Sequence, residues 1–391
     1  MIKDPLLIVL VLLSIVIFIL HLSEHPRYKS WFKFLPYIFW IFFIPMMIST
    51  AGLIDDKSPV YQMATKNFLP ASLFLLLISV DLKLIFRLGW PALFVFFAGS
   101  FGVMLGAVAA FSIFKQWVGP EFWSGFGTIA GSWTGGSANM IAVKESLATP
   151  DAIFLPFVVV DTIVPYVWMA MIVAASKSQS VVNRWMDADP RILEDINKRL
   201  SYIKSHMETA QFRWPITVLI FVAALIVSVF IQQITAFLPQ VEGIISQFTW
   251  VIILASFLGL AGSMTPLHRI VHFGTTRVGY FLLYFVLTTI GAKANLSNLG
   301  SAFILIAAGF LIASIHGIVT LAAARLIRAP IFLVAAASQA NLGGVASAPI
   351  VAEIYQPGLS AIGLLMAILG NIVGTYLGIM TGEICRMISG V

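Results

Sequence analysis

The chain has 391 residues, of which 60% are hydrophobic and only 10% carry a charge at neutral pH. Soluble proteins carry about 25% charged residues, so this composition excludes a soluble domain of ordinary size. The net charge of +6 comes from Lys and Arg residues that flank apolar segments, and we expect no nucleic-acid partner.

Apolar segments of about 20 residues recur from end to end, and each is long enough to cross a hydrocarbon core of ~30 Å. We expect the segment 5–22 to be a retained span, because it lacks a strongly basic start and a small-residue cleavage site. We therefore expect an all-α, multi-pass protein of the inner or plasma membrane, in contact with the lipid bilayer. The predicted spans are 5–22, 32–54, 67–82, 91–114, 122–147, 151–176, 214–238, 247–263, 277–292, 300–325, 330–354 and 359–382.

The one long polar stretch lies between residues 177 and 213. It contains Asp189-Pro190, a typical helix start, followed by apolar residues at helical spacing. This pattern predicts an amphipathic helix that lies on the membrane or against the protein. The predicted organisation is a first transmembrane repeat over 1–176, a polar linker over 177–213 and a second transmembrane repeat over 214–391.

The two halves resemble each other. Residues 39–89 match 250–300 in hydropathy, and the segment that starts at Asp161 aligns with the one that starts at Asn371. Basic residues lie mostly at opposite ends of the matching spans, which indicates inverted repeats under the positive-inside rule. Six predicted spans per half would instead make the copies parallel. We take the charge asymmetry as the stronger indication.

Each half also carries a pair of glycines inside an apolar segment. Gly135-Gly136 lies within residues 131–139 and Gly343-Gly344 within residues 338–347, both among hydroxyl and amide side chains. Paired glycines weaken a helix, and matched interruptions in two halves indicate the binding site of a secondary transporter. Close helix packing through small residues is the alternative explanation. The matched pairs favour two crossing discontinuous helices.

Hydroxyl, amide and backbone oxygens at such breaks suit a hard cation, and half-helix N-termini suit an anionic group. Asp161 lies in the middle of a span, where a carboxylate costs about 2.5–3.5 kcal/mol and is functional by default. It is predicted to bind the ion or to carry a proton. The predicted substrate- and ion-binding residues are Ser132, Thr134, Gly135, Gly136, Ser137, Asn139, Asp161, Gln339, Asn341, Gly343, Gly344, Ser347 and Asn371. The expected Na⁺ ligands are Thr134, Asn139, Asp161, Gln339 and Asn341.

Signatures of catalysis are missing from the sequence. There is no Gly-x-Ser-x-Gly, His-Glu-x-x-His or Walker motif, and Cys385 is the single cysteine. His316 lies inside a span, where a hydrogen-bonded buried histidine is commoner than a titrating one. We expect no enzyme activity and no organic cofactor.

Three motifs, at residues 69–83, 131–143 and 338–349, occur in this order and together are similar to the DUF819 family of membrane proteins. More distantly, residues 134–139 are similar to a motif of the bile acid sodium symporters, whose clan includes cation/proton antiporters. The resemblance implies a core domain with two crossed, unwound helices that moves against a panel domain. Thr134 stands where the symporters have proline, no match exists for their Glu-rich second ion site, and Val160 replaces a polar residue of the antiporters.

Together these patterns predict a secondary active transporter with Na⁺-coupled symport of a small organic anion, amino acid or short peptide. The alternative is a Na⁺/H⁺ antiporter in which Asp161 alternates between the two ions. A non-transporting scaffold or receptor is a third class. The sequence does not identify the solute or the oligomeric state, although the panel helices of such folds often form homodimers.

Overall fold

A computed structural model describes residues 1–28, 32, 37–206, 213–240, 246–293 and 302–390, without the side chains of residues 200–206. Within these ranges the chain is helical apart from turns, loops and one isolated bridge between Ile2 and Ile54, which confirms the all-α class. Six of the described helices are long and apolar enough to cross a membrane. The number rises to seven if α12 and η4, which meet at 96°, form one bent span. The chain is therefore a multi-pass membrane protein.

Fewer helices meet this criterion than the twelve spans predicted, because several predicted spans are short or interrupted. The predicted span 32–54 contains a helix of only 14 residues, α2 (Tyr37–Thr50). The predicted span 122–147 is divided into α6 (Trp123–Gly135) and α7 (Ser137–Ser146). The predicted span 330–354 is likewise divided into α15 (Ile331–Leu342) and α16 (Gly344–Tyr355).

The chain folds into two compact units, each assembled from separate segments. Unit 1 comprises Met1–Val80, Thr149–Val158 and Ala210–Ser301, and unit 2 comprises Asp81–Ala148, Val159–Thr209 and Ala302–Val391. Both divided helices belong to unit 2. The organisation into two sequence repeats, and their inverted orientation, stay predictions.

Unit 1 is built around α3, which contacts α11, α12 and α13. Ala71 and Leu75 of α3 pack against Ala224 of α11 and Leu282 of α13 in one apolar cluster. Besides α2, its described helices are α1 (Pro5–Glu24), α3 (Pro59–Ile78), α11 (Trp214–Thr235), α12 (Gln247–Ser263), η4 (Pro266–Phe273) and α13 (Thr275–Lys293).

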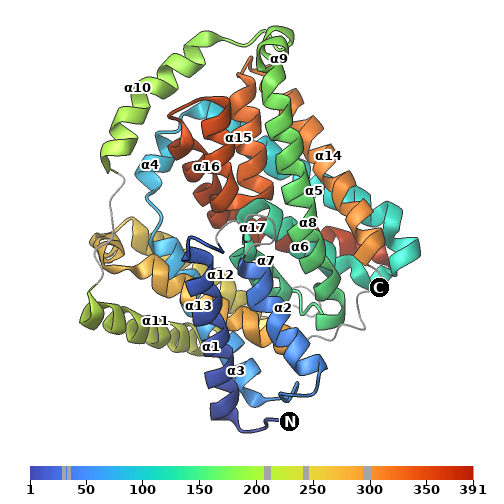
Figure 1. Ribbon diagram of the computed structural model, residues 1–391, viewed down its shortest axis with the longest axis vertical. Coiled ribbons are helices and arrows are strands. Elements are labelled where there is room, and N and C mark those ends of the chain that lie inside the picture. Colours follow the sequence, from blue (N-terminus) through green and yellow to red (C-terminus); the bar gives the residue numbers. More distant parts are fainter. Residues whose placement is uncertain (29–31, 33–36, 207–212, 241–245, 294–301, 391) are drawn as a thin grey trace. The chain divides into compact units, whose positions relative to one another are not determined.

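Unit 2 is built around the long helix α17 (Ser360–Ser389), which contacts α5, α6, α7, α15 and α16 (Figure 1). A second close pair joins α5 (Trp90–Val118) to α14 (Ala302–Leu326). The remaining helices of this unit are α4 (Leu82–Phe86), η2 (Pro120–Phe122), most of α8 (Asp151–Ala175), η3 (Ser176–Ser178), α9 (Gln179–Trp185) and α10 (Pro190–His206).

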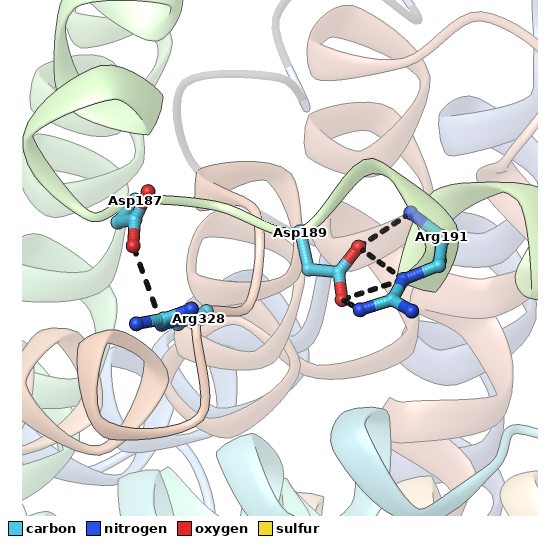
Figure 2. A network of polar contacts seen from close by, with 4 residues as sticks. All are labelled: Asp187, Asp189, Arg191 and Arg328. Carbon is cyan, nitrogen blue, oxygen red and sulfur yellow. Dashed lines mark hydrogen bonds and ion pairs between the residues drawn. The ribbon is translucent and has the colours of Figure 1, made fainter.

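Helix α10 of the polar linker begins at the position that the sequence predicts. Helix α10 starts at Pro190, and the Asp189 carboxylate accepts a hydrogen bond of 2.9 Å from the Arg191 backbone N–H. Figure 2 shows the Arg191 guanidinium against the same carboxylate, and Asp187 facing Arg328. The Asp187 carboxylate and the Arg328 guanidinium form an ion pair of 3.3 Å. The hydrogen bonds from Arg191 hold the pKa of Asp189 below its usual value.

The linker is also attached to the turn between α14 and α15. The Asp189 backbone N–H donates to the Arg328 carbonyl at 2.8 Å, and the Arg325 guanidinium lies over the Trp185 ring at 4.0 Å. The Asn183 side-chain carbonyl accepts a hydrogen bond of 2.8 Å from the backbone N–H of the first residue of α15. The linker thus caps the N-terminus of α15, the first half of the second divided helix.

Candidate functional site

The first break lies at Gly136, between α6 and α7. Gly136 has φ 82° and ψ −178°, a conformation open to glycine alone, so its sequence position fixes the end of α6. The Asn139 side-chain N–H donates to the Gly135 carbonyl, and its oxygen accepts from the Thr375 hydroxyl of α17. Asn139 therefore closes the break and ties it to α17.

Glycines bring α6 and α17 into backbone contact beside this break, in what we call the glycine seam. A Cβ on Gly370 would collide with the Thr134 carbonyl, and a Cβ on Gly374 would approach the Gly135 Cα to 2.7 Å. The contact repeats every four residues, as expected for small-xxx-small packing in membranes. The seam consists of Gly127, Gly131 and Gly135 in α6 and Gly370, Gly374, Gly378 and Gly382 in α17. The four-residue spacing is visible in the sequence, and it is the signal from which this contact could have been predicted.

The second break lies at Gly343, between α15 and α16, and the positive φ of 62° falls on Gly344. The Gln339 side-chain N–H donates to the Ser347 hydroxyl across the break at 2.9 Å. A Cβ on Gly343 would collide with both of these side chains. The paired glycines thus have separate roles. Gly344 adopts the positive φ of the turn, and Gly343 leaves room for the hydrogen bond between Gln339 and Ser347.

Asn341 holds α15 against α5. Its side-chain oxygen accepts from the Ser100 hydroxyl at 2.8 Å, and its N–H donates to the carbonyls of Phe96 at 3.3 Å and Ala337 at 3.0 Å. All of its polar atoms have partners inside the protein. The oxygens of Asn341 and Asn139 each accept one hydrogen bond here and keep a second lone pair.

Two buried oxygens at the breaks have no partner among the described residues. They are the Thr134 hydroxyl, one residue before Gly135, and the Gln339 side-chain carbonyl. Thr134 is 0% exposed and Gln339 is 1% exposed. A buried polar atom without a partner costs about 1–3 kcal/mol, which favours a ligand or an ordered water at each position.

Asp161 of α8 faces the last turn of α6 before the first break. One carboxylate oxygen, Oδ1, accepts hydrogen bonds from the Ser132 hydroxyl at 2.8 Å and the Trp133 indole N–H at 3.0 Å. None of the ion pairs formed among the described residues includes Asp161. Pro165 lacks an N–H, so the Asp161 backbone carbonyl also loses its i+4 helical donor.

A second network joins α8 to the other divided helix. The Trp168 indole N–H donates to the Ser338 hydroxyl of α15 at 2.9 Å, seven residues after Asp161 and on the same side of α8. His316 of α14 contacts Ser338 through Nε2 at 2.8 Å and the Gly99 carbonyl through Nδ1 at 2.8 Å. A carbonyl only accepts and an indole only donates, so Nδ1 carries a proton toward Gly99 and the Ser338 hydroxyl accepts from Trp168.

The predicted site residues all lie in unit 2. Asn371 of α17 reaches the first break, because its side-chain oxygen is 3.8 Å from the position that a Cβ would take on Gly136. Ser137 is partly exposed at the same break. Helices α15 and α16 each contact α6, so the two breaks belong to neighbouring elements. Sequence reasoning named these residues as a candidate site but missed the hydrogen bonds of Trp168 and Ser338, because pairing between distant spans leaves no local pattern.

The charge of this region is low. Asp161 is the only charged residue among the predicted site residues, and the others offer hydroxyl, amide or backbone groups. Across the described ranges, no three His, Cys, Asp or Glu side chains are grouped to hold a metal ion. The predicted site therefore offers a bound ion one carboxylate together with neutral oxygen ligands.

Two comparisons with known proteins place the chain among membrane proteins. The family described as "Protein of unknown function (DUF819)" matches residues 8–388. A relative from Bacillus subtilis (strain 168), the uncharacterized membrane protein YjcL, is 25% identical over 347 residues, which cover 85% of this chain and 86% of the relative. Because the family match spans almost the whole sequence, the chain belongs to the DUF819 family of membrane proteins.

Proposed function

We propose that this protein is a secondary active transporter, without enzyme activity, that couples Na⁺ to the symport of a small organic solute by alternating access. The observation that carries the proposal is the presence of two glycine-interrupted helices in one compact unit, each with a buried, unpartnered oxygen at its break. Discontinuous helices of this kind form the substrate and ion sites of secondary transporters.

The unpartnered oxygens support a cation as one ligand. Na⁺ prefers several oxygen ligands, and the Thr134 hydroxyl, the Gln339 carbonyl and the Asp161 carboxylate are candidates. A single carboxylate balances one monovalent charge. Asn139 and Asn341 remain candidate ligands in this proposal, and their side chains also hydrogen-bond to Thr375 of α17 and Ser100 of α5.

The helix ends support an anionic group on the solute. Helices α7 and α16 begin at the breaks, and neither has a side chain that caps its first backbone N–H groups. An uncapped helix N-terminus attracts negative charge. A carboxylate of an organic anion, an amino acid or a short peptide fits this requirement.

Antiport of Na⁺ and H⁺ is the second candidate, and Asp161 favours it. Its carboxylate lies on a membrane helix with only neutral hydrogen-bond donors among the described residues, so either a proton or a cation would neutralise it. Antiport moves protons out of a liposome when Na⁺ is added without any organic solute. Symport leaves the internal pH unchanged under the same conditions.

Thermal unfolding of the purified protein tests the ion site without knowledge of the solute. Binding to the folded state raises the melting temperature by mass action, so NaCl should stabilise the protein more than KCl at equal ionic strength. Asp161→Asn keeps the shape of the side chain and should abolish this difference. Asp187→Asn, in the exposed linker, is the matched control and should preserve it. Equal melting temperatures for the wild type in the two salts would refute Na⁺ binding.

A further inference from the structure

Unit 1 contains a cavity of about 720 Å³ that is unrelated to the divided helices. It lies between α1, α11 and α13, and its volume is within the range of about 300–1,000 Å³ that is usual for small-molecule sites. Most of its lining is apolar or aromatic, including Leu20, Val218, Phe221 and Phe281. The cavity is thus suited to a ligand with a hydrocarbon portion.

Two charged side chains belong to the lining of the cavity. Glu24, the last residue of α1, and Arg277, in the first turn of α13, both line it. Both residues are exposed, and neither forms an ion pair with a described residue. One anionic and one cationic side chain therefore face the same ligand space without neutralising each other.

The aromatic lining indicates the depth of this site in the membrane. Trp214 at the start of α11 is 69% exposed, and Tyr280 stacks on Tyr284 with ring centroids 5.8 Å apart. Trp and Tyr concentrate at the level of lipid headgroups. Arg27 follows the end of α1, and Arg213 and Arg277 lie at the starts of α11 and α13. The positive-inside rule assigns all three to the cytoplasmic face.

We propose that this cavity binds a zwitterionic phospholipid with a primary ammonium headgroup, as in phosphatidylethanolamine. Arg277 faces the phosphate, Glu24 faces the ammonium group, and an acyl chain lies along Val218 and Phe221. The ligand's two opposite charges match the two side chains, whereas a purely anionic lipid would leave Glu24 beside its negative charge. The occupant is therefore a lipid of both charges rather than an anionic lipid or a free fatty acid.

The test compares lipids that differ only in the headgroup. Native mass spectrometry of the purified full-length protein should show tighter binding of phosphatidylethanolamine than of phosphatidylcholine or phosphatidylglycerol with the same chains. Trimethylation removes the N–H groups that would donate to Glu24, and glutamine keeps an acceptor but loses the negative charge, so Glu24→Gln should reduce the preference for ethanolamine over choline. Arg277→Gln should weaken phosphatidylethanolamine binding roughly fivefold, since each basic residue near the surface contributes about that factor.

Arg269→Gln is the matched control, because Arg269 is exposed in unit 1 and does not line the cavity. It should bind all three lipids as the wild type does. Equal binding of the three lipids by the wild type would overturn the proposal. So would unchanged binding by Arg277→Gln, or a dimer in which a second copy displaces lipid from this face.

Discussion

The contact between α6 and α17 gives the sharpest prediction about stability. Gly370 lies against the Thr134 carbonyl, and a Cβ there would also come within 3.2 Å of the Thr134 carbonyl carbon and 3.4 Å of the Phe96 ring. Two of these atoms belong to a helix backbone and cannot rotate away. Gly370→Ala should therefore push α6 from α17.

The magnitude follows from two opposing effects. Overpacking of a close contact costs about 1–3 kcal/mol, while alanine gains about 1 kcal/mol of helix propensity over glycine. The difference is a net loss of roughly 0–2 kcal/mol, and the upper part of this range is expected because the Thr134 backbone cannot rotate away. Since Thr134 adjoins the first break, Gly370→Ala should also reduce the difference in melting temperature between NaCl and KCl.

Reversible unfolding in mixed micelles measures the loss, and Gly262→Ala is the matched control. A Cβ on Gly262 would meet only the flexible end of Ile78, at 3.0 Å, so this variant should be close to neutral. The reasoning is refuted if Gly370→Ala unfolds like the wild type and responds to Na⁺ like the wild type.

Three further predictions concern the network around α15 and the linker. Trp168→Phe removes the indole N–H that Ser338 accepts and should lower the free energy of unfolding by about 0.6 kcal/mol, measured as a double-mutant cycle with Ser338→Ala. Asn183→Ala removes the cap of α15 and should lower stability by about 0.5–2 kcal/mol; unchanged amide exchange in the first turn of α15 would contradict it. The pKa of Asp189 is lowered in the folded protein by Arg191, so its contribution is present above the unfolded pKa and is lost on acidification. Asp189→Asn should therefore make unfolding less sensitive to acid, by a small amount because the group is exposed.

The sequence predicted much of the fold because its main signals are local. The predicted apolar spans include all six described helices that are long enough to cross a membrane, and Pro190 marked the start of α10. The interruptions were also predictable, since only glycine adopts the backbone conformation found at Gly136.

The partners of the polar side chains were not predictable in the same way. Asn139 and Asn341 are recognisable in the sequence as amides inside apolar segments, but their contacts with Thr375 and Ser100 join residues more than two hundred positions apart. Likewise, Asp161 stands out by its charge, while the identity of its donors, Ser132 and Trp133, depends on how α8 packs against α6.

The glycine seam between α6 and α17 has a consequence for how the protein responds to heat. Glycine has no rotamers to lose, so this contact forms without freezing side-chain motion. Elsewhere, as in the cluster of Leu75 and Leu282 in unit 1, flexible side chains gain freedom as the temperature rises. Thermal softening should therefore begin among such aliphatic side-chain contacts, while the seam beside Gly135 keeps its spacing until the helices themselves unfold.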